Sequence, residues 1–133
     1  RAPMTMAFPP AEGDVHTYER TFTREDVRRF GEISGDQQAI HTEPDEEGRL
    51  VVQGLLTATL PTKIGGDLSY IARSMEFDFL QPVRTGATIS CEWTNETVEE
   101  RPDRYNVTSS VVCSNPDDET VMEARIDGLI WKE

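Results

Sequence analysis

Two residues that can exchange protons, Asp36 and His41, occupy one polar stretch of this 133-residue chain. A carboxylate and an imidazole are side chains that act as general base and general acid near neutral pH. In one loop they can share a single water molecule and add its two parts to the same face of a substrate. The spacing alone is weak evidence, because an Asp after a helix end is commonly a turn residue that bonds nearby amides. A His in a polar loop is commonly just exposed, which is how we interpret His16.

The elements that must position this pair begin with an amphipathic helix, predicted over residues 24–33. Thr23 can cap its first turn by accepting a hydrogen bond from the amide of Asp26, and apolar residues then recur at helical spacing. A short strand is predicted around residues 16–22. Residues 1–14 have no periodic pattern, so we expect them to form an extended lead-in.

A buried helix is predicted over residues 50–64, the most apolar segment of the chain. Its residues are apolar nearly all round, as in a helix without a solvent-facing side. Gly65 and Gly66 are expected to end it. Pro61 is expected to break or kink it, because a proline ring clashes with the carbonyl of the preceding turn.

Alternating apolar and polar residues predict four further strands, near residues 74–79, 89–94, 105–113 and 122–130. Strands and one apolar helix can bury each other as an antiparallel sheet wrapped around that helix. The sequence therefore predicts a single α+β domain over residues 15–133. Such a sheet has exposed edges, and pairing them between copies would make a homodimer or a dimer of dimers.

Cys91 and Cys113 fall on two neighbouring predicted strands. Two cysteines so far apart in the sequence are too few for a zinc site, and we expect no metal. They can lie near each other across the sheet, where a disulfide is conceivable. Free buried thiols are the expectation for a reducing compartment.

The composition is strongly acidic, with 25 Asp and Glu against 13 Lys and Arg and a net charge of −12. Nucleic acids and anionic membranes attract basic patches, so this balance argues against both as partners. No apolar run approaches the ~20 residues of a membrane span, and a cytoplasmic location is expected. Scarce lysine and excess acid are typical of a protein from a high-salt cytoplasm, where self-repulsion is screened. An ordinary acidic cytosolic protein is the alternative.

Three motifs follow one another along the chain: Phe30-x-x-x-Ser34-Gly35-Asp36-x-x-x-x-His41, then Val52-x-Gly54, then Phe79-x-x-Pro82-Val83-x-x-Gly86. In this order, with the predicted elements between them, they resemble the MaoC-like (R)-specific enoyl-CoA hydratases. The resemblance implies a hot-dog fold. It also implies hydration of a trans-2-enoyl-CoA to a 3-hydroxyacyl-CoA, or the reverse dehydration. The coenzyme A thioester is then itself the substrate, so no cofactor is expected.

The resemblance also implies roles for individual residues. Asp36 corresponds to a base and His41 to an acid on a shared water, and the N–H of Gly54 to the donor for the enolate oxygen. Gln53 stands beside that glycine. Thr57 or Thr59 corresponds to the polar residue found one turn into the helix. These residues are the expected catalytic and acyl-binding positions.

The chain departs from the family pattern at several positions. Gln38-Ala39 replace a common Asn-Pro, Gln53 replaces a common His, and the loop before Gly54 is short. None of these changes removes a proton-transfer group, but the short loop and Pro61 alter the walls of the acyl pocket. The phosphates of coenzyme A require a local basic patch on so acidic a protein. The candidates for that patch, which can equally be solvated surface residues, are Lys63, Arg73 and Arg84.

Two other functions fit the same fold. A hot-dog thioesterase would use a carboxylate to hydrolyse acyl-CoA and would release a free thiol. A non-catalytic acyl-CoA-binding or assembly subunit would bind the thioester without turnover. The spacing of Asp36 and His41 favours the hydratase, because a binding protein needs neither group.

Overall fold

The computed structural model describes residues 8–133, so the first seven residues of the predicted lead-in lie outside the described residues. Its five strands form one antiparallel sheet in the order β1-β3-β4-β5-β2. The strands are β1 (Val15–Thr21), β2 (Ile71–Phe79), β3 (Thr88–Glu100), β4 (Arg104–Ser114) and β5 (Thr120–Trp131). The helices are α1 (Arg24–Ser34), α2 (Ala39–Thr42), α3 (Gly54–Thr57) and α4 (Thr59–Asp67).

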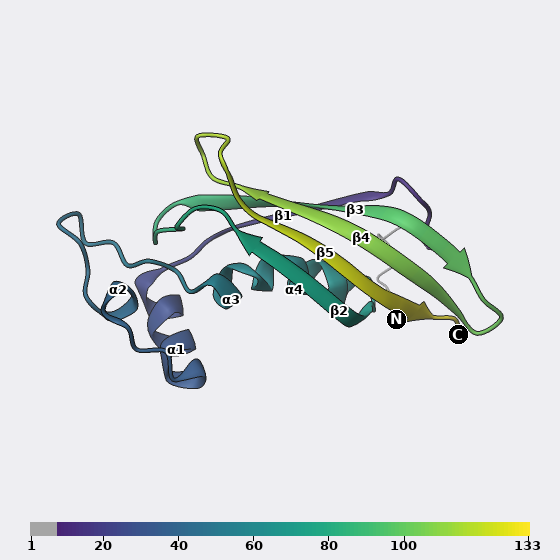
Figure 1. Ribbon diagram of the computed structural model, residues 1–133, viewed down its shortest axis with the longest axis horizontal. Coiled ribbons are helices and arrows are strands. Elements are labelled where there is room, and N and C mark those ends of the chain that lie inside the picture. Colours follow the sequence, from purple (N-terminus) through teal and green to yellow (C-terminus); the bar gives the residue numbers. More distant parts are fainter. Residues whose placement is uncertain (1–7) are drawn as a thin grey trace.

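The helices α3 and α4 lie along one face of the sheet, while α1 and α2 lie beyond one of its ends (Figure 1). This arrangement confirms the predicted α+β hot-dog fold. The described part of the lead-in is bonded to the sheet, because the amide of Gly13 donates to the carbonyl of Asn95 at 2.8 Å.

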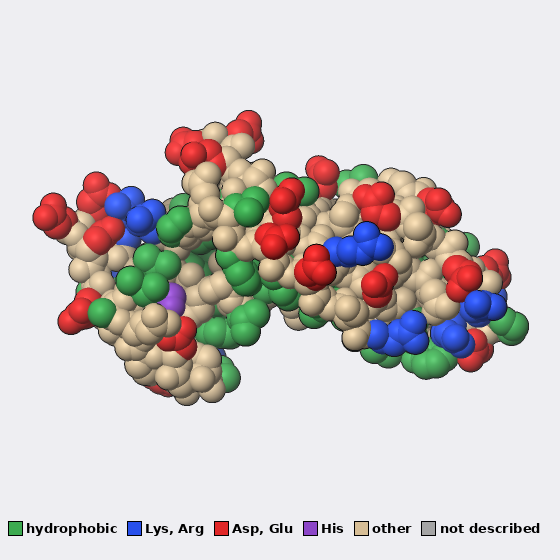
Figure 2. All heavy atoms as spheres, viewed as in Figure 1, with side chains coloured by type: hydrophobic (Ala, Val, Ile, Leu, Met, Phe, Trp, Pro, Cys, Tyr) green, Lys and Arg blue, Asp and Glu red, His purple; other side chains and the backbone are tan. Residues whose placement is uncertain are grey.

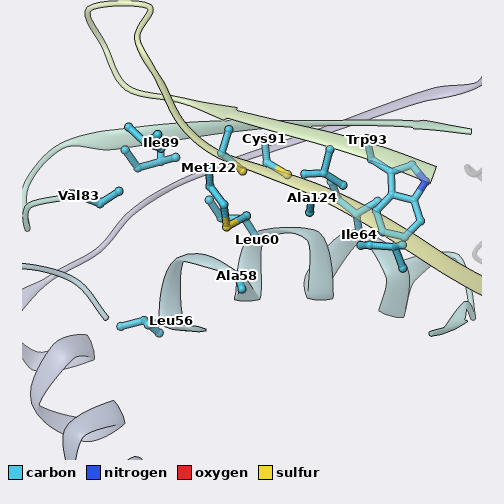
Figure 3. Close-up of a cluster of buried hydrophobic side chains, with 14 of the residues drawn as sticks. Leu56, Ala58, Leu60, Ile64, Val83, Ile89, Cys91, Trp93, Met122 and Ala124 are labelled. Carbon is cyan, nitrogen blue, oxygen red and sulfur yellow. The ribbon is translucent and has the colours of Figure 1, made fainter. Parts of the chain in front are cut away.

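The hydrophobic core lies between α4 and the sheet (Figure 3). Leu60 and Ile64, one turn apart on α4, are buried with Trp93 of β3 and Met122 of β5. The Trp93 indole donates to the side-chain oxygen of buried Asn95 at 2.9 Å, so its one polar atom is satisfied inside the core. This packing anchors the central helix and therefore the start of α3.

The central helix differs from its prediction. Residues 50–53 are extended, and Val52 donates to the carbonyl of Val83 at 2.7 Å, so the helix begins only at Gly54. Apolar composition alone cannot distinguish a buried extended segment from a buried helix. The expected interruption at Pro61 is present as a break between α3 and α4, since a proline has no N–H for the carbonyl of Thr57. The helix then continues through both glycines to Asp67.

The first helix begins and ends where the sequence predicts. Thr23 accepts a hydrogen bond from the amide of Asp26 at 3.1 Å, and the Asp26 carboxylate accepts one from the amide of Thr23 at 2.9 Å. Gly35 ends the helix in the left-handed conformation with φ 77°, which a glycine adopts without steric cost. The chain therefore turns sharply just before Asp36.

The two cysteines face each other across the sheet. Cys91 of β3 is the direct register partner of Cys113 of β4, and both are buried free thiols, as the sequence predicts. A hydrogen bond with Cys113, together with burial, raises the pKa of the Cys91 thiol well above its usual range. Cys91 is therefore a structural thiol rather than a nucleophile.

Among residues 8–133, no helix combines the length and the apolar character that crossing a bilayer requires.

Candidate active site

The polar loop after α1 forms a single helical turn, α2, which carries His41. The sequence pattern predicts only a polar loop for this segment, without a helix. His41 is only 6% exposed, and its Nδ1 lies 2.6 Å from the carbonyl oxygen of Val51. A carbonyl oxygen can only accept, so we assign the proton of the neutral ring to Nδ1. Nε2 therefore carries the proton that His41 gains when the ring is charged and loses when it is neutral.

The Nε2 atom of His41 faces Asp36, whose Oδ2 lies 3.5 Å away. This separation is too long for a strong direct hydrogen bond, yet it is short enough for one water molecule beside the pair to contact both atoms. The turn at Gly35 and the turn of α2 thus bring the two sequence-predicted residues together.

Asp36 is held in its charged form by its neighbours. The side-chain amide of Gln38 donates to Asp36 Oδ1 at 3.0 Å. This bond, the backbone N–H of Gln38 and the charge of His41 lower the pKa of the Asp36 carboxyl below its ordinary value. From the sequence, Gln38 is identified only as a departure from the family pattern. The available signal was its position two residues after an Asp, where turn contacts are common.

A groove of about 630 Å³ opens beside the pair and is mostly apolar. Of the described residues that line it, Asp36 and His41 alone are ionisable. Figure 2 shows hydrophobic side chains gathered where the α1–α2 end of the molecule meets the sheet. The apolar part of the lining comes from α1, α3, the end of β2 and the segments beside them: Phe30, Ile40, Val51, Val52, Leu55, Phe79, Leu80, Pro82, Val83 and Val121.

Gly54 lines the same groove as the first residue of α3. The amides of a first helical turn have no partner within the helix, so the N–H of Gly54 is available to a ligand. A Cβ atom at this position would lie 2.9 Å from Cε1 of Phe79. A larger residue at this position would therefore have to displace the Phe79 ring. The groove combines a carboxylate, an imidazole and an amide donor.

The family model for the MaoC like domain matches residues 7–115. The chain belongs to the MaoC-like domain family. Among solved structures, protein AF1124 from Archaeoglobus fulgidus is 29% identical with TM-score 0.80, covering 95% of this chain and 82% of that one. The (R)-hydratase from A. caviae involved in PHA biosynthesis is 20% identical with TM-score 0.80, covering 92% of this chain and 98% of that one.

A third similar structure is the C-terminally truncated HadBC complex, a (3R)-hydroxyacyl-ACP dehydratase from Mycobacterium tuberculosis. It is 22% identical with TM-score 0.67, covering 90% of this chain and 96% of that chain. The two neighbours below 25% identity support the hot-dog fold alone. No curated protein sequence gave a significant match.

The other predicted acyl-site residues of this MaoC-like protein divide into two groups. Gln53 and Thr57 are buried residues of the groove lining. The side-chain Nε2 of Gln53 donates to the carbonyl of Val27 at 3.0 Å, which ties the start of α3 to α1, while its Oε1 is buried without a partner. Thr59 does not line the groove, and its hydroxyl donates to the carbonyl of Leu56 at 2.5 Å.

The three predicted cations of the MaoC-like protein are not gathered at the groove. Lys63 pairs with Asp67 on α4 and lies 5.5 Å from the centre of the Tyr18 ring. Arg73 lines a separate cavity of about 550 Å³. Arg84 is exposed and pairs by its backbone with Val51, which lines the groove. Of the three, only Arg84 is adjacent to the candidate site.

Proposed function

We propose that this MaoC-like protein adds water to a trans-2-enoyl-CoA to form the (R)-3-hydroxyacyl-CoA, or catalyses the reverse dehydration. The observation that carries the proposal is the 3.5 Å separation of Asp36 Oδ2 and His41 Nε2 in an apolar groove. Hydration of a conjugated thioester needs a base for water, an acid for the α-carbon and a donor for the enolate oxygen. Asp36, His41 and the N–H of Gly54 supply these three groups.

In the hydration direction, the Asp36 carboxylate takes a proton from the shared water as the water oxygen bonds to C3. The electrons of the C2–C3 double bond move toward the thioester and form an enolate. Protonated His41 then delivers its Nε2 proton to C2, and the enolate electrons form the new C–H bond. Asp36 and His41 act on the shared water from one side of the substrate, so the hydroxyl and the proton add to the same face.

The pair then returns to its starting state. Asp36 holds a proton and His41 has lost one, and their side chains are 3.5 Å apart. The hydrogen bonds from Gln38 favour the charged carboxylate, so the proton passes from Asp36 to His41. No other proton carrier is needed for turnover. The bond from His41 Nδ1 to Val51 keeps the ring oriented throughout.

The thioester oxygen is placed against the N–H of Gly54. The helix α3 has only four residues, so its dipole is small and the stabilisation comes from the hydrogen bond itself. The acyl chain occupies the apolar walls formed by residues such as Val52 and Leu55. Arg84 is the nearest of the candidate cations for a phosphate of coenzyme A.

The active form is a homodimer in which a second copy covers β2. This strand is at one edge of the sheet, and two of its core-facing side chains remain exposed. Met75 and Phe79 lie opposite the buried Ile126 and Met122 of β5, yet they are 43% and 50% exposed. An unpaired edge with exposed apolar residues favours pairing with another strand. The similar HadBC structure is itself that of a complex.

The test is the loss of enoyl-thioester absorbance from crotonyl-CoA in molar salt, followed by chiral analysis of the product. Asp36→Asn and His41→Ala are each expected to lose about 10²–10⁴-fold in rate, as for removal of a general base or acid. His16→Ala is the matched control, since this half-buried histidine of β1 lies outside the groove. Turnover that both active-site variants retain would refute the proposal. Release of free thiol without hydration would indicate a thioesterase instead.

A further inference from the structure

Gln38 contacts both members of the proton-transfer pair. It lies between Asp36 and His41 in the sequence, at the residue just before α2. Its side-chain Nε2 and its backbone N–H both donate to the Asp36 carboxylate. Its backbone carbonyl accepts from the backbone N–H of His41. No other described residue has a hydrogen bond to the side chain of Asp36 and another to the backbone of His41.

The two oxygens of the Asp36 carboxylate have different partners, because the side chain of Gln38 bonds to only one of them. Oδ1 accepts from Gln38 Nε2 at 3.0 Å and from the Gln38 amide at 3.4 Å. Oδ2 is left to face His41 Nε2 at 3.5 Å. Rotation of the carboxylate about its Cβ–Cγ bond would break the shorter bond to Gln38. The contact therefore keeps one defined oxygen directed at the water site.

The backbone of Gln38 fixes the other member of the pair. The His41 amide donates to the Gln38 carbonyl at 2.9 Å, which closes the turn of α2. Thr42 adds a second bond to the same carbonyl at 3.4 Å. A change of the Gln38 side chain leaves this carbonyl in place, so the two functions can be separated by mutation.

Few other groups act on Asp36. From α1, Ser34 accepts a hydrogen bond from the Asp36 amide at 3.1 Å and carries no charge. From α2, His41 is the one titratable group that acts on the carboxylate. The segment of residues 50–54 presents no ionisable side chain to the groove. The side-chain amide of Gln38 is therefore the main neutral group that holds the Asp36 carboxylate.

We infer that Gln38 is a positioning residue, which holds Asp36 Oδ1 through its side-chain amide so that Oδ2 faces the water shared with His41. This inference rests on the proposed hydratase function for its effect on rate. The contact itself can be tested without any turnover. Its chemical requirement is a neutral hydrogen-bond donor at this position, because a carboxylate is an acceptor only.

The test compares Gln38→Leu, which removes the donor, with Gln38→Glu, which replaces it by an isosteric acceptor. The Asp36 carboxyl carbon is followed by NMR titration in each full-length variant, and its signal is assigned from Asp36→Asn. The pH dependence of kcat/KM with crotonyl-CoA is measured beside it. Gln37→Leu and Gln37→Glu are the matched controls, since Gln37 is exposed, adjacent and outside the groove.

We expect the Asp36 titration and the acid limb of kcat/KM to move to higher pH in Gln38→Leu and further in Gln38→Glu. The maximal rate is expected to fall about tenfold in Gln38→Leu, as for loss of one hydrogen bond to a charged group. Gln37→Leu is expected to titrate and turn over like the wild type, and Gln37→Glu is expected to move the Asp36 titration less than Gln38→Glu does. Circular dichroism confirms that each variant is folded.

An Asp36 titration that is unmoved in Gln38→Leu and Gln38→Glu would overturn the inference, whatever the rates. Equal shifts in Gln38→Glu and Gln37→Glu would also overturn it, because they would indicate only a general effect of added charge. A wild type without hydratase activity would refute the proposed function instead. The NMR titration would still decide whether Gln38 holds the carboxylate.

Discussion

His41 is tied through its Nδ1 to the carbonyl oxygen of Val51 at 2.6 Å, ten residues further along the chain. Val51 belongs to the extended segment that leads into α3, so this one bond links the acid of the proposed reaction to the segment that carries Gly54. It also determines which ring nitrogen faces Asp36. The spacing of all three groups in the groove therefore depends on how residues 50–53 are packed.

The proposed reaction should tolerate acid better than an ordinary carboxylate would allow. The side-chain amide of Gln38, with its backbone N–H and the charge of His41, lowers the pKa of Asp36. Since the charged form is the active one, kcat/KM for hydration is expected to persist below the usual titration range of Asp before it falls. A pH–rate profile with crotonyl-CoA measures this limb. A fall in kcat/KM within or above the usual titration range of Asp would contradict the assignment of Asp36 as the base.

The same shift has a consequence for stability. A carboxyl whose pKa is lower in the folded state stabilises the fold above its unfolded pKa. That contribution is lost as the pH falls through the folded value. The difference in unfolding free energy between wild type and Asp36→Asn should therefore shrink in acid, as measured by urea denaturation at several pH values.

The N–H of Gly54 can be tested separately from the space around it. Gly54→Ala keeps the donor but places a Cβ 2.9 Å from the Phe79 ring. Gly54→Pro adds the same Cβ and removes the donor, and the extended backbone of Gln53, with φ −58° and ψ 141°, is compatible with a following proline. In a Phe79→Leu background, the proline variant is expected to be about 10²–10³-fold slower than the alanine variant.

Hydration rates of these double variants give the comparison, and thermal unfolding establishes that both are folded. Equal rates for the proline and alanine variants would show that the N–H of Gly54 does not stabilise the enolate. Gly54→Ala alone should lose hydration rate, and adding Phe79→Leu should restore part of that rate. Failure to recover would place the requirement for glycine elsewhere than at Phe79.

The proposed dimer should separate when a charge is placed on the open side of β2. Met75 faces the core side of the sheet but is 43% exposed, so Met75→Asp should give a monomer by light scattering at molar salt. Ser74→Asp adds the same charge to the opposite face of the strand and is the control. A monomeric wild type would refute the homodimer, and a dimeric Met75→Asp protein would place its interface elsewhere.

Salt is expected to stabilise this protein. The net charge is −12, and no Asp or Glu among the described residues is buried, so the acids repel one another at the surface. Molar KCl screens this repulsion and should raise Tm by roughly 5–10 °C relative to dilute buffer. Circular dichroism melts give Tm, and sucrose at equal osmolality controls for solute exclusion. A Tm that falls with KCl would exclude the high-salt interpretation.

Local patterns in the sequence were sufficient for most of the elements. The Thr23 cap, the stop at Gly35 and the alternating strands each depend on neighbouring residues, and the structure has them where they were predicted. The pairing of Cys91 with Cys113 followed from the strand pattern as well. The start of the central helix was predicted too early, because residues 50–53 are buried by long-range pairing with the segment at Val83.

By itself, the sequence determined the α+β class, the membership of Asp36, His41 and Gly54 in one family pattern, and the acidic surface. Residue type, order and period carry that information, and they act over a few positions of the chain. Only the tertiary structure decided that Gln38 holds Asp36, that Thr57 rather than Thr59 lines the groove, and that the three predicted cations lie apart. The first two outcomes depend on the direction of individual side chains, and the third depends on how distant segments are packed together, which only folding decides.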